Sequence, residues 1–572
     1  MSMQPRTVIS IALLFLSTWV YAGQREDVGY TQLRDRLGEK TPTGKGIMVS
    51  AYEPESHEYG QENSGNPMGW IPATVDGNDH ISTIEMYQGA PMAIKSGNTS
   101  GHAAAVSRFM FGKEHGVSQA LEAVKFHFIE DYIGYLLYPR TFYQATNPSY
   151  RGTVFESTVN NFSAISDFGQ NNVDFLRRFD WATSREDTVN LISAGNNKYT
   201  NASAIFGSSL NGIYVGLTSG WHSRYTTQHH YHPQNRPDIV APNINTSRGT
   251  GTITGITAVL METASTAELS DLGLTQANTL IRNAERSETM KAILMAGADR
   301  TTANTRENTY PRDKDGKWIA DPDGKFRKSI ADINDYKKSN KFETANGLDT
   351  RYGAGQANVE TSYDILMGAE QASLEDDGAQ SVSLLGFDYD GSFGLGTKNQ
   401  QSNGTATYVL PTIEEDSDIA ITLAWNADFA SYNGVFNAVA VYDLDLWLYQ
   451  VIDNEEKLIA WSSSNTANTE NIWAKLEKGG NYFFRVDTTK NLVALLWDYA
   501  IAWRVTSQEL SNTEAPNNQL TSLNVATTSV PLPSSMVLFL SSIFFLLQKK
   551  KLDLINPLRK DSNLKNISQK NR

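Results

Sequence analysis

Ser247 stands at the start of a long helical pattern, within the segment RPDIVAPNINTSRGTGTITGITAVL that spans residues 236–260. The N-terminus of a helix leaves backbone N–H groups without intrahelical partners and carries positive dipole charge. Those groups can stabilise an alkoxide on the serine and the oxyanion that forms when it attacks a carbonyl. Serine is also a common N-cap residue. The segment therefore indicates a nucleophile but does not decide for one.

A histidine and an asparagine could complete such a site. His102 lies in GHAAAV (101–106), and a histidine near its ordinary pKa can accept the serine proton at neutral pH and return it to a leaving amine. Asn196 ends the segment LISAGN (191–196), where its side-chain amide could donate a hydrogen bond to the oxyanion. Each residue alone also has an ordinary structural interpretation.

A carboxylate is available upstream of both. Glu53 follows the strand-like run GIMVSAY (46–52). A carboxylate at the end of such a strand can accept the histidine N–H, fix its tautomer and stabilise the imidazolium. Glu55 is a second candidate, and a surface pair of glutamates is the alternative interpretation of both.

Together these segments resemble the subtilisin-like serine proteases, the subtilases. That family has Pro-Asp-(Ile/Val)-Val-Ala-Pro, then Gly-Thr-Ser, then a helix with a glycine eight positions after the serine. Here PDIVAP (237–242) precedes Ser247, and Gly255 lies eight residues after it. The order carboxylate, histidine, asparagine, serine also agrees. Further matching segments are NGIYVG (211–216), KAILMAGA (291–298) and RYGAG (351–355), so the resemblance covers roughly residues 40–365.

Several positions depart from the family pattern, and the stretch from Pro242 to Ser247 is also shorter than in the family. Glu53 replaces an aspartate, Asn245 a glycine, Arg248 a small or apolar residue, and Gly251 a proline. Glutamate serves in the triads of other serine hydrolases. Because it is one methylene longer than aspartate, the backbone or the histidine must be placed differently here.

The resemblance implies a serine endopeptidase that hydrolyses protein or peptide substrates by acyl transfer. Ser247 would attack the carbonyl, His102 would act as base and then acid, and Glu53 would orient His102. Asn196 and the Ser247 N–H would hold the oxyanion. No cofactor is required. The departures leave a rival, a catalytically impaired homologue that acts as a surface or matrix binding protein. A hydrogen bond between Glu53 and His102 would discriminate between the two.

Two regions of different pattern must position these residues. Across residues 44–362, short apolar runs alternate with helical stretches, which favours a parallel sheet covered by helices, and we interpret 277–297 as a helix followed by a strand. Across about 381–505, apolar residues alternate with smaller or polar ones in short runs. The sequence thus predicts an α/β fold, a subtilisin-like parallel sheet flanked by helices, followed by an all-β sandwich.

The alternation in the second region predicts its core. The alternating residues are Ile419, Ile421, Leu423, Trp425, Leu444, Leu446, Leu448, Tyr499, Ile501, Trp503 and Val505. Trp425, Trp447 and Trp503 occupy strand positions, so we expect core packing for them rather than a platform for a glycan or protein ligand.

Six segments follow along the chain. We expect a signal peptide (1–22), a peptidase domain (23–368), a β-sandwich (381–508), a flexible linker (509–529), a sorting or transmembrane segment (530–551) and a basic tail (552–572). The 572 residues are too many for one hydrophobic core.

Composition narrows the function classes. The formal net charge of −14 argues against a nucleic-acid partner, because a polyanion would be repelled. The absence of cysteine excludes disulfides, thiolate catalysis and cysteine zinc sites. An exported protein of this size without cysteines points to bacteria.

Both ends carry targeting patterns. Arg6 and the apolar run VISIALLFLSTWV (8–20) indicate a signal peptide cleaved after Ala22, with an uncleaved anchor as the alternative. VPLPSSMVLFLSSIFFLLQKKK (530–551) resembles the PEP-CTERM sorting signals that bacterial exosortases process, although 21 further residues follow it. We expect an extracellular or cell-surface protein that is transiently anchored in the membrane, with a plain tail anchor as the alternative.

Two segments raise the question of metal ions. Carboxylates precede glycines in DKDG (313–316) and DPDG (321–324), a pattern that can wrap calcium. A solvated, turn-rich insertion is the favoured interpretation, so calcium remains a candidate structural ion without assigned ligands. Four histidines, His222, His229, His230 and His232, fall within 11 residues. Their spacing fits no zinc template, and a loop lining the substrate cleft is favoured.

Overall fold

The computed structural model describes fifteen stretches of the chain. They are residues 24–57, 69–72, 82–85, 99–137, 154–164, 172–196, 207–223, 237–266, 268–300, 344–377, 381–394, 404–432, 435–440, 442–488 and 497–507. All of them belong to the first of two compact units, Met1–Asn512 and Thr513–Arg572. The expected signal peptide, linker, sorting segment and basic tail lie outside the described residues.

A seven-stranded sheet forms the first region, and all of its described pairings are parallel. Its strands are β1 (Met48–Glu53), β2 (Ser82–Glu85), β3 (Ala123–Phe128), β4 (Val159–Phe162), β5 (Val189–Ser193), β6 (Ile213–Leu217) and β7 (Ile239–Ala241), in the order β2-β3-β1-β4-β5-β6-β7. The runs GIMVSAY, VNLISAGN and GIYVGLT form β1, β5 and β6 as expected. Buried strands with helices on both sides explain these nearly continuous apolar runs.

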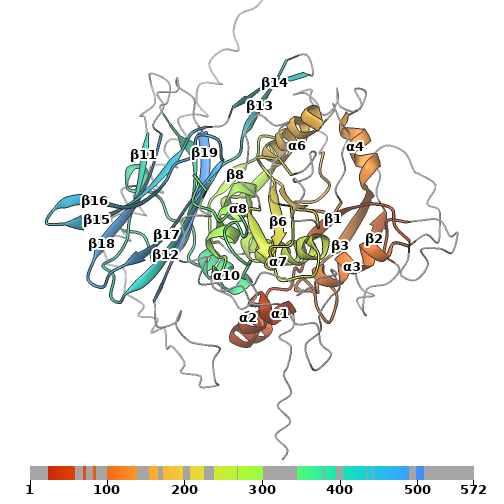
Figure 1. Ribbon diagram of the computed structural model, residues 1–572, viewed down its shortest axis with the longest axis horizontal. Helices are drawn as coiled ribbons and strands as arrows, with labels where there is room; N and C mark the ends of the chain where they lie inside the picture. Colours follow the sequence, from red (N-terminus) through yellow and green to blue (C-terminus); the bar gives the residue numbers. More distant parts are fainter. Residues whose placement is uncertain are drawn as a thin grey trace, which may run out of the picture. The chain divides into compact units, whose positions relative to one another are not determined.

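Helices cover both faces of this sheet (Figure 1). Along β1, Val49 and Ala51 pack into one core with α3 (Gly101–Met110), α7 (Thr246–Thr266), α8 (Ser287–Ala296) and α10 (Val359–Met367). Tyr52 points to the other face, into a second core with α4 (Ile129–Leu137) and α6 (Asn172–Glu186). Alternate residues of one strand thus serve two cores. The N-terminal helix α2 (Tyr30–Leu37) contributes Tyr30 and Leu33 to the first core, and Val28 joins it directly after α1 (Gln24–Asp27).

One expectation about this region is wrong. Residues 277–297 were expected to form a helix and then a strand, but the order is reversed. A short hairpin of β8 (Leu272–Leu274) and β9 (Leu280–Arg282) comes first, and α8 begins only at Ser287. The polar stretch from Asn283 to Arg286 interrupts the helical pattern, and all ten residues of α8 are buried, so its apolar end LMA resembled a buried strand.

Two four-stranded antiparallel sheets form the second region. One has the order β10-β19-β12-β17 and the other β11-β18-β15-β16. The strands are β10 (Leu385–Phe393), β11 (Thr405–Val409), β12 (Ser417–Ala424), β15 (Asp445–Ile452), β16 (Glu455–Ser462), β17 (Thr469–Leu476), β18 (Asn481–Asp487) and β19 (Trp497–Ser507), with β13 (Asp428–Tyr432) and β14 (Val435–Ala440) as a separate hairpin. A short helix, α11 (Leu374–Asp377), precedes them. The α/β class with a following all-β sandwich is therefore confirmed.

The core of the sandwich contains the residues that alternation predicted. Ile419, Ile421 and Leu423 of β12 are fully buried, as are Leu446 and Leu448 of β15 and Tyr499 and Ile501 of β19, whereas Val505 near the end of β19 is only partly buried. Trp425 and Trp503 also lie in this core, as expected. Trp447 does not, because it lies on the opposite side of β15 from the buried Leu446 and Leu448 and is only half-buried.

Polar contacts join the sandwich to the α/β region. The Asn211 side chain donates to the Ala427 carbonyl at 3.0 Å and accepts from its N–H at 2.7 Å. The Arg504 guanidinium of β19 donates to the carbonyls of Ala296 and Ala298 at the end of α8. Both contacts satisfy buried backbone groups that no regular element reaches.

Candidate active site

Glu53 is the last residue of β1, at the carboxyl edge of the parallel sheet. Its side chain is completely buried. A buried carboxylate is unfavourable unless charge or hydrogen bonds compensate for its lost hydration. Glu55, the alternative carboxylate, is exposed. Of the two glutamates, the structure therefore turns only Glu53 inward.

The chain just after Glu53 holds the start of helix α3. Ser100 is the N-cap, and its hydroxyl accepts from the Ala103 N–H at 3.0 Å. The Ser56 hydroxyl lies 2.7 Å from that of Ser100 and accepts from the His102 N–H at 3.2 Å. The segment that carries the carboxylate thus also fixes the first turn of the helix that carries the histidine.

His102 and Glu53 meet directly. The distance from His102 Nδ1 to Glu53 Oε2 is 2.6 Å. Burial alone would lower the pKa of the His102 imidazole, but the charge and hydrogen bond of Glu53 outweigh it, so the pKa lies above its usual value even though Arg248 acts in the lowering direction. With Nδ1 engaged by the carboxylate, Nε2 is the nitrogen left for proton transfer.

Helix α7 runs alongside α3 (Figure 1), and two glycines of α7 lie where the helices approach most closely. A Cβ at Gly251 would lie 2.7 Å from the Val106 carbonyl oxygen, and one at Gly255 would lie 2.6 Å from that of Met110. The two glycines are four residues apart on α7, and the two carbonyls are four residues apart on α3, so the helices run parallel. One turn before Gly251 and Val106 in each helix are Ser247 and His102, which therefore lie at the same height along the pair. Both residues occupy the second position of their helices.

The Ser247 hydroxyl is nevertheless not directed at His102. It donates to the backbone carbonyl of Ser163 at 3.0 Å, and the described residues show no hydrogen bond between Ser247 and His102. Ser247 is buried, with 6% of its surface exposed. A rotation about its Cα–Cβ bond is therefore needed before the hydroxyl can donate to the imidazole.

Asn196 lies beside the start of α7. Its carboxamide oxygen accepts from both the N–H and the hydroxyl of Thr246, at 2.8 and 2.9 Å. Two donors on the oxygen fix the plane of the amide, so its NH₂ group is directed elsewhere. Ser193 at the end of β5 donates to the Thr246 hydroxyl at 2.8 Å, so it also holds the first residue of α7 in place.

Three of the sequence departures have structural explanations. Asn245 is the N-cap of α7, because its side-chain oxygen accepts from the Arg248 N–H at 2.9 Å. Gly251 permits the close approach of α3. The Arg248 guanidinium lies 5.7 Å from the centre of the Phe109 ring on α3. Asn245 thus stabilises the start of α7, whereas Gly251 and Arg248 serve the contact between the two helices.

Sequence reasoning missed several supporting residues. Ser163, whose carbonyl holds the Ser247 hydroxyl, follows β4, and Ser56 and Ser100 form the clamp on α3. Backbone carbonyls and capping serines have no distinctive sequence pattern. In the run VNNFSA (159–164) Ser163 directly follows four buried residues of β4, and this position after a strand was the available signal for it.

The histidine cluster is only partly described. His222 is completely buried, and its Nδ1 accepts from the Leu217 N–H at 2.9 Å. It packs against Gly216, where a Cβ would lie 2.9 Å from the imidazole ring. His229, His230 and His232 lie outside the described residues, as do the calcium-like segments 313–316 and 321–324. The described stretches contain no group of three or more potential metal ligands.

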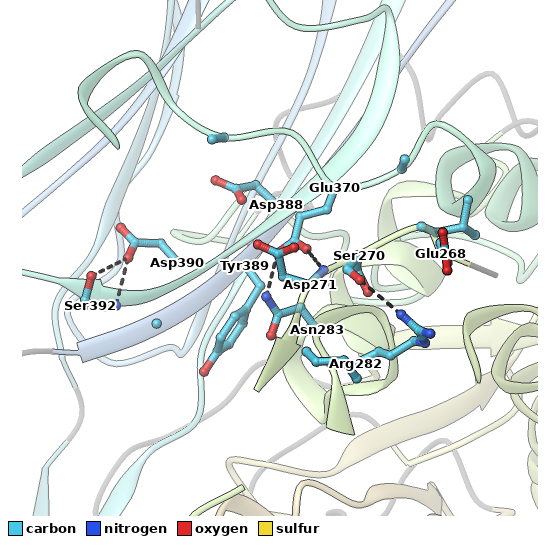
Figure 2. A pocket seen from close by; sticks show the side chains of 15 residues that line it. Glu268, Ser270, Asp271, Arg282, Asn283, Glu370, Asp388, Tyr389, Asp390 and Ser392 are labelled. Carbon is cyan, nitrogen blue, oxygen red and sulfur yellow. Dashed lines mark hydrogen bonds between the residues drawn. The ribbon is translucent and has the colours of Figure 1, made fainter. Parts of the chain in front are cut away.

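A groove of about 820 Å³ lies elsewhere, between the β8–β9 hairpin and the start of the sandwich (Figure 2). On one side of the groove, the Glu370 carboxylate accepts hydrogen bonds from the Asp271 N–H and the Asn283 side chain, each at 2.7 Å. Tyr389 of β10 lines the same groove. None of the four proposed site residues lines it, so the groove is distinct from the Glu53–His102 pair.

Within the described part of the chain, no helix is both long and apolar enough to cross a membrane. Segment 530–551 is not part of that description.

Comparisons with known proteins give weak matches. No family model and no curated protein matches the chain. Tripeptidyl peptidase 2 is 11% identical, with a TM-score of 0.28, over 71% of this chain and 40% of that one. MycP1 from the ESX-1 type VII secretion system is 11% identical, with a TM-score of 0.30, over 59% and 84%.

The sandwich has a separate match. The pre-peptidase C-terminal domain of a Bacillus anthracis collagenase is 14% identical, with a TM-score of 0.16, over 24% of this chain and 96% of that one. At such identities and scores these likenesses carry no information about the chemistry of this chain.

Proposed function

We propose that this chain is a subtilisin-like serine endopeptidase with a Ser-His-Glu triad. The observation that carries the proposal is the 2.6 Å contact of His102 with a fully buried Glu53, level with Ser247 on the parallel helix. A histidine held by a fully buried carboxylate beside a helix N-terminus is the arrangement that general-base activation of a hydroxyl needs.

In the proposed reaction, the Ser247 hydroxyl leaves the Ser163 carbonyl and donates to His102 Nε2. The imidazole takes the proton as the serine oxygen attacks the peptide carbonyl, and then gives it to the leaving amine. Glu53 keeps the Nδ1 proton in place and stabilises the imidazolium. Water then hydrolyses the acyl-enzyme by the same proton transfers in reverse. Hydrogen bonds that are misdirected without substrate often align only in the complex.

The Ser247 backbone N–H and the Asn196 NH₂ group would stabilise the oxyanion. Support comes from the two bonds that fix the Asn196 carboxamide oxygen on Thr246, the residue before the nucleophile. A donor held in advance reorganises little when charge develops on the carbonyl oxygen.

One observation favours a second function, that of a catalytically impaired homologue acting as a surface or matrix binding protein. The Ser247 hydroxyl is held by the Ser163 carbonyl at 3.0 Å rather than by the imidazole. A serine locked in that bond would leave the Glu53–His102 pair without a proton donor.

A fluorophosphonate probe separates the two functions. We expect the purified full chain to be labelled, and Ser247→Ala and His102→Ala to lose labelling, because the probe reacts only with an activated serine. Ser417→Ala, a change to a buried serine in the sandwich, is the matched control and should label like the wild type. A folded wild type that stays unlabelled would favour the binding protein.

We also propose export in a bacterial host, with the signal peptide removed and the C-terminal segment 530–551 processed by an exosortase-type enzyme. Protein or peptide substrates would then be met outside the cell or at its surface. No cofactor is needed for the chemistry, and calcium stays a candidate structural ion. The mass of the protein recovered from its own host would reveal both cleavages.

A further inference from the structure

The outer face of the sheet β11-β18-β15-β16 carries aromatic side chains in rows across the strands. One row joins Arg485, Trp447 and Trp461 in direct register. The next joins Phe483, Tyr449 and Leu458. Neighbouring strands are about 4.8 Å apart, so side chains of one row lie side by side on a single surface.

This surface is open to solvent at its β16 side. Trp461 is 61% exposed and Leu458 is 40% exposed, Trp447 and Tyr449 are half-buried, and Phe483 is buried beside them, with 5% of its surface exposed. The Tyr449 and Phe483 rings stack with their centres 5.0 Å apart. A contiguous aromatic surface on a soluble protein marks an interaction site far more often than scattered apolar residues do.

Polar groups border the aromatic rows. The Arg485 guanidinium lies 5.3 Å from the Tyr449 ring centre and 4.9 Å from that of Phe483, and it pairs with Glu456 at 3.2 Å. Its Nε donates to the Thr407 hydroxyl. The rings are therefore held rigidly and hydrogen-bonding groups stand next to them, as in sites that bind a ligand with one apolar face and polar edges.

The area of the surface argues against a protein partner. Its exposed apolar area is on the order of 300 Å², given that an aromatic side chain offers about 150–250 Å². A stable protein interface buries about 800 Å² on each partner. A narrow polymer laid across two or three rings matches this area better than a second protein surface does.

Charge argues against a polyanion. The turn into β16 carries Asp453, Glu455 and Glu456 against the single cation Lys457, and the whole chain has a net charge of −14. Nucleic acids and strongly acidic glycans would be repelled. A neutral sugar chain meets no such penalty. The rings of an equatorially linked pyranose chain present flat C–H faces to the aromatic rings and hydroxyl edges to the polar groups.

We propose that this aromatic face binds a neutral, β-linked glycan chain, with Trp461 and Trp447 as the stacking platform and Arg485 and Glu456 as hydrogen-bonding partners for its hydroxyls. The binding is independent of the serine chemistry. It would hold the protein on a polysaccharide surface.

The test measures binding of the full chain to microcrystalline cellulose and chitin by depletion from solution, and to cellohexaose and chitohexaose by tryptophan fluorescence. We expect binding to at least one polymer and its matching oligosaccharide, and Trp461→Ala to weaken it by about tenfold or more through the lost stacking area. Trp461→Phe, which keeps a ring, should retain part of the affinity.

Leu272→Ala is the matched control. Leu272 is 56% exposed on the β8–β9 hairpin, so its removal changes a similar apolar surface away from the sandwich face. Unchanged melting temperatures would exclude misfolding of the variants. Absence of binding to all four glycans overturns the proposal, as does binding that survives Trp461→Ala. Self-association that Trp461→Ala abolishes, without glycan binding, would assign the face to a second copy instead.

Discussion

Glu53 is one methylene longer than the aspartate in the subtilase pattern that the sequence resembles, and the fold accommodates that length. The carboxylate still reaches His102 Nδ1 at 2.6 Å from the end of β1. Its second oxygen, Oε1, is buried and has no hydrogen-bond partner among the described residues. The negative charge is thus directed mainly at the imidazole, which is why the pKa of His102 stays above its usual value despite burial.

Replacing Glu53 by glutamine should slow fluorophosphonate labelling by about 10³–10⁴-fold, because the amide cannot stabilise the imidazolium and can favour the wrong tautomer. Labelling requires neutral His102, so it rises with pH through the pKa of that histidine. Without the carboxylate, burial dominates and the pKa falls. We therefore expect the midpoint of the pH–labelling curve to move to lower pH.

Glu53→Asp is the conservative control at this position. Aspartate keeps the negative charge, but its side chain is one methylene shorter, so the carboxylate lies farther from His102. The labelling rate should therefore lie between those of the wild type and the glutamine variant. An unchanged midpoint in Glu53→Gln would mean that the carboxylate does not control His102.

Helices α3 and α7 bring the histidine and the serine together, and they pack closely at a seam formed by Gly251 and Gly255 of α7. At Gly251 and Gly255 the backbone of α3 comes so close that no side chain fits between the helices. The side of α7 that faces α3 is thus determined by the absence of Cβ atoms. A small displacement at this seam changes the distance between imidazole and hydroxyl.

Gly251→Ala should lower the free energy of unfolding by about 1–3 kcal/mol, because the new methyl would lie 2.7 Å from the Val106 carbonyl oxygen and force the helices apart. Labelling of Ser247 should fall as well. Thermal unfolding and probe kinetics on the same sample would measure both effects.

Gly249→Ala provides the comparison within the same helix. A Cβ there would make ordinary contacts at 3.4 Å with Ala241 and Leu217, so the change should be tolerated. The better helix propensity of alanine favours this variant slightly. If both alanine variants unfolded alike, close packing on α3 would not be the cause.

At the scale of the whole described chain, a cluster of ionisable groups is sealed between the α/β region and the sandwich. Arg286 pairs with Asp187 at 2.7 Å, and the Tyr389 hydroxyl of β10 donates to Asp498 of β19 at 3.0 Å. The Arg286 guanidinium lies 4.2 Å from the Tyr389 ring centre. Glu288 of α8 completes the cluster, which thus contains three carboxyl groups and one guanidinium.

Burial dominates the titration of this cluster. It raises the pKa of Glu288 to about 8 and that of Asp498 to about 7, and it also raises the pKa of Asp187. Tyr389 lines the groove of Figure 2, so water reaches the edge of the cluster there. Several of the carboxyl groups at the junction between the two regions therefore change charge near neutral pH.

We expect the melting temperature to fall as the pH rises from 6 to 9. In the unfolded chain Glu288 loses its proton near the ordinary glutamate pKa of 4.5, whereas in the native state its pKa is raised to about 8. Over this window the native state binds more protons, so the free energy of unfolding decreases with pH. Differential scanning calorimetry across the range would measure the slope.

Glu288→Gln isolates the effect. Its carboxamide oxygen can still accept from Ser287 and Asn426, which now bond to Glu288 at 2.8 and 2.7 Å, but it carries no charge at high pH. The decline above pH 7 should become smaller, while the exposed control Glu415→Gln should follow the wild type. Equal slopes in all three proteins would remove Glu288 from the explanation.

Sequence alone determined the architecture, because the periodic spacing of apolar residues within each segment predicts whether that segment forms a strand or a helix. Apolar runs between helical stretches predicted the parallel sheet, and the alternation around Ile421, Leu446 and Ile501 predicted the sandwich core. Ser247, His102, Asn196 and Glu53 were selected from segment patterns, which depend on neighbours in the chain. The same local reasoning failed at 277–297, where a fully buried helix has no polar face to reveal its period.

Only the tertiary structure decided how these residues meet. The choice of Glu53 over Glu55, the bond of Ser247 to Ser163 and the outward position of Trp447 depend on contacts between segments far apart in sequence. The buried cluster around Glu288 depends on how two regions pack together. Distance and burial across such contacts are set by the packing of whole elements, and no pattern of neighbouring residues encodes them.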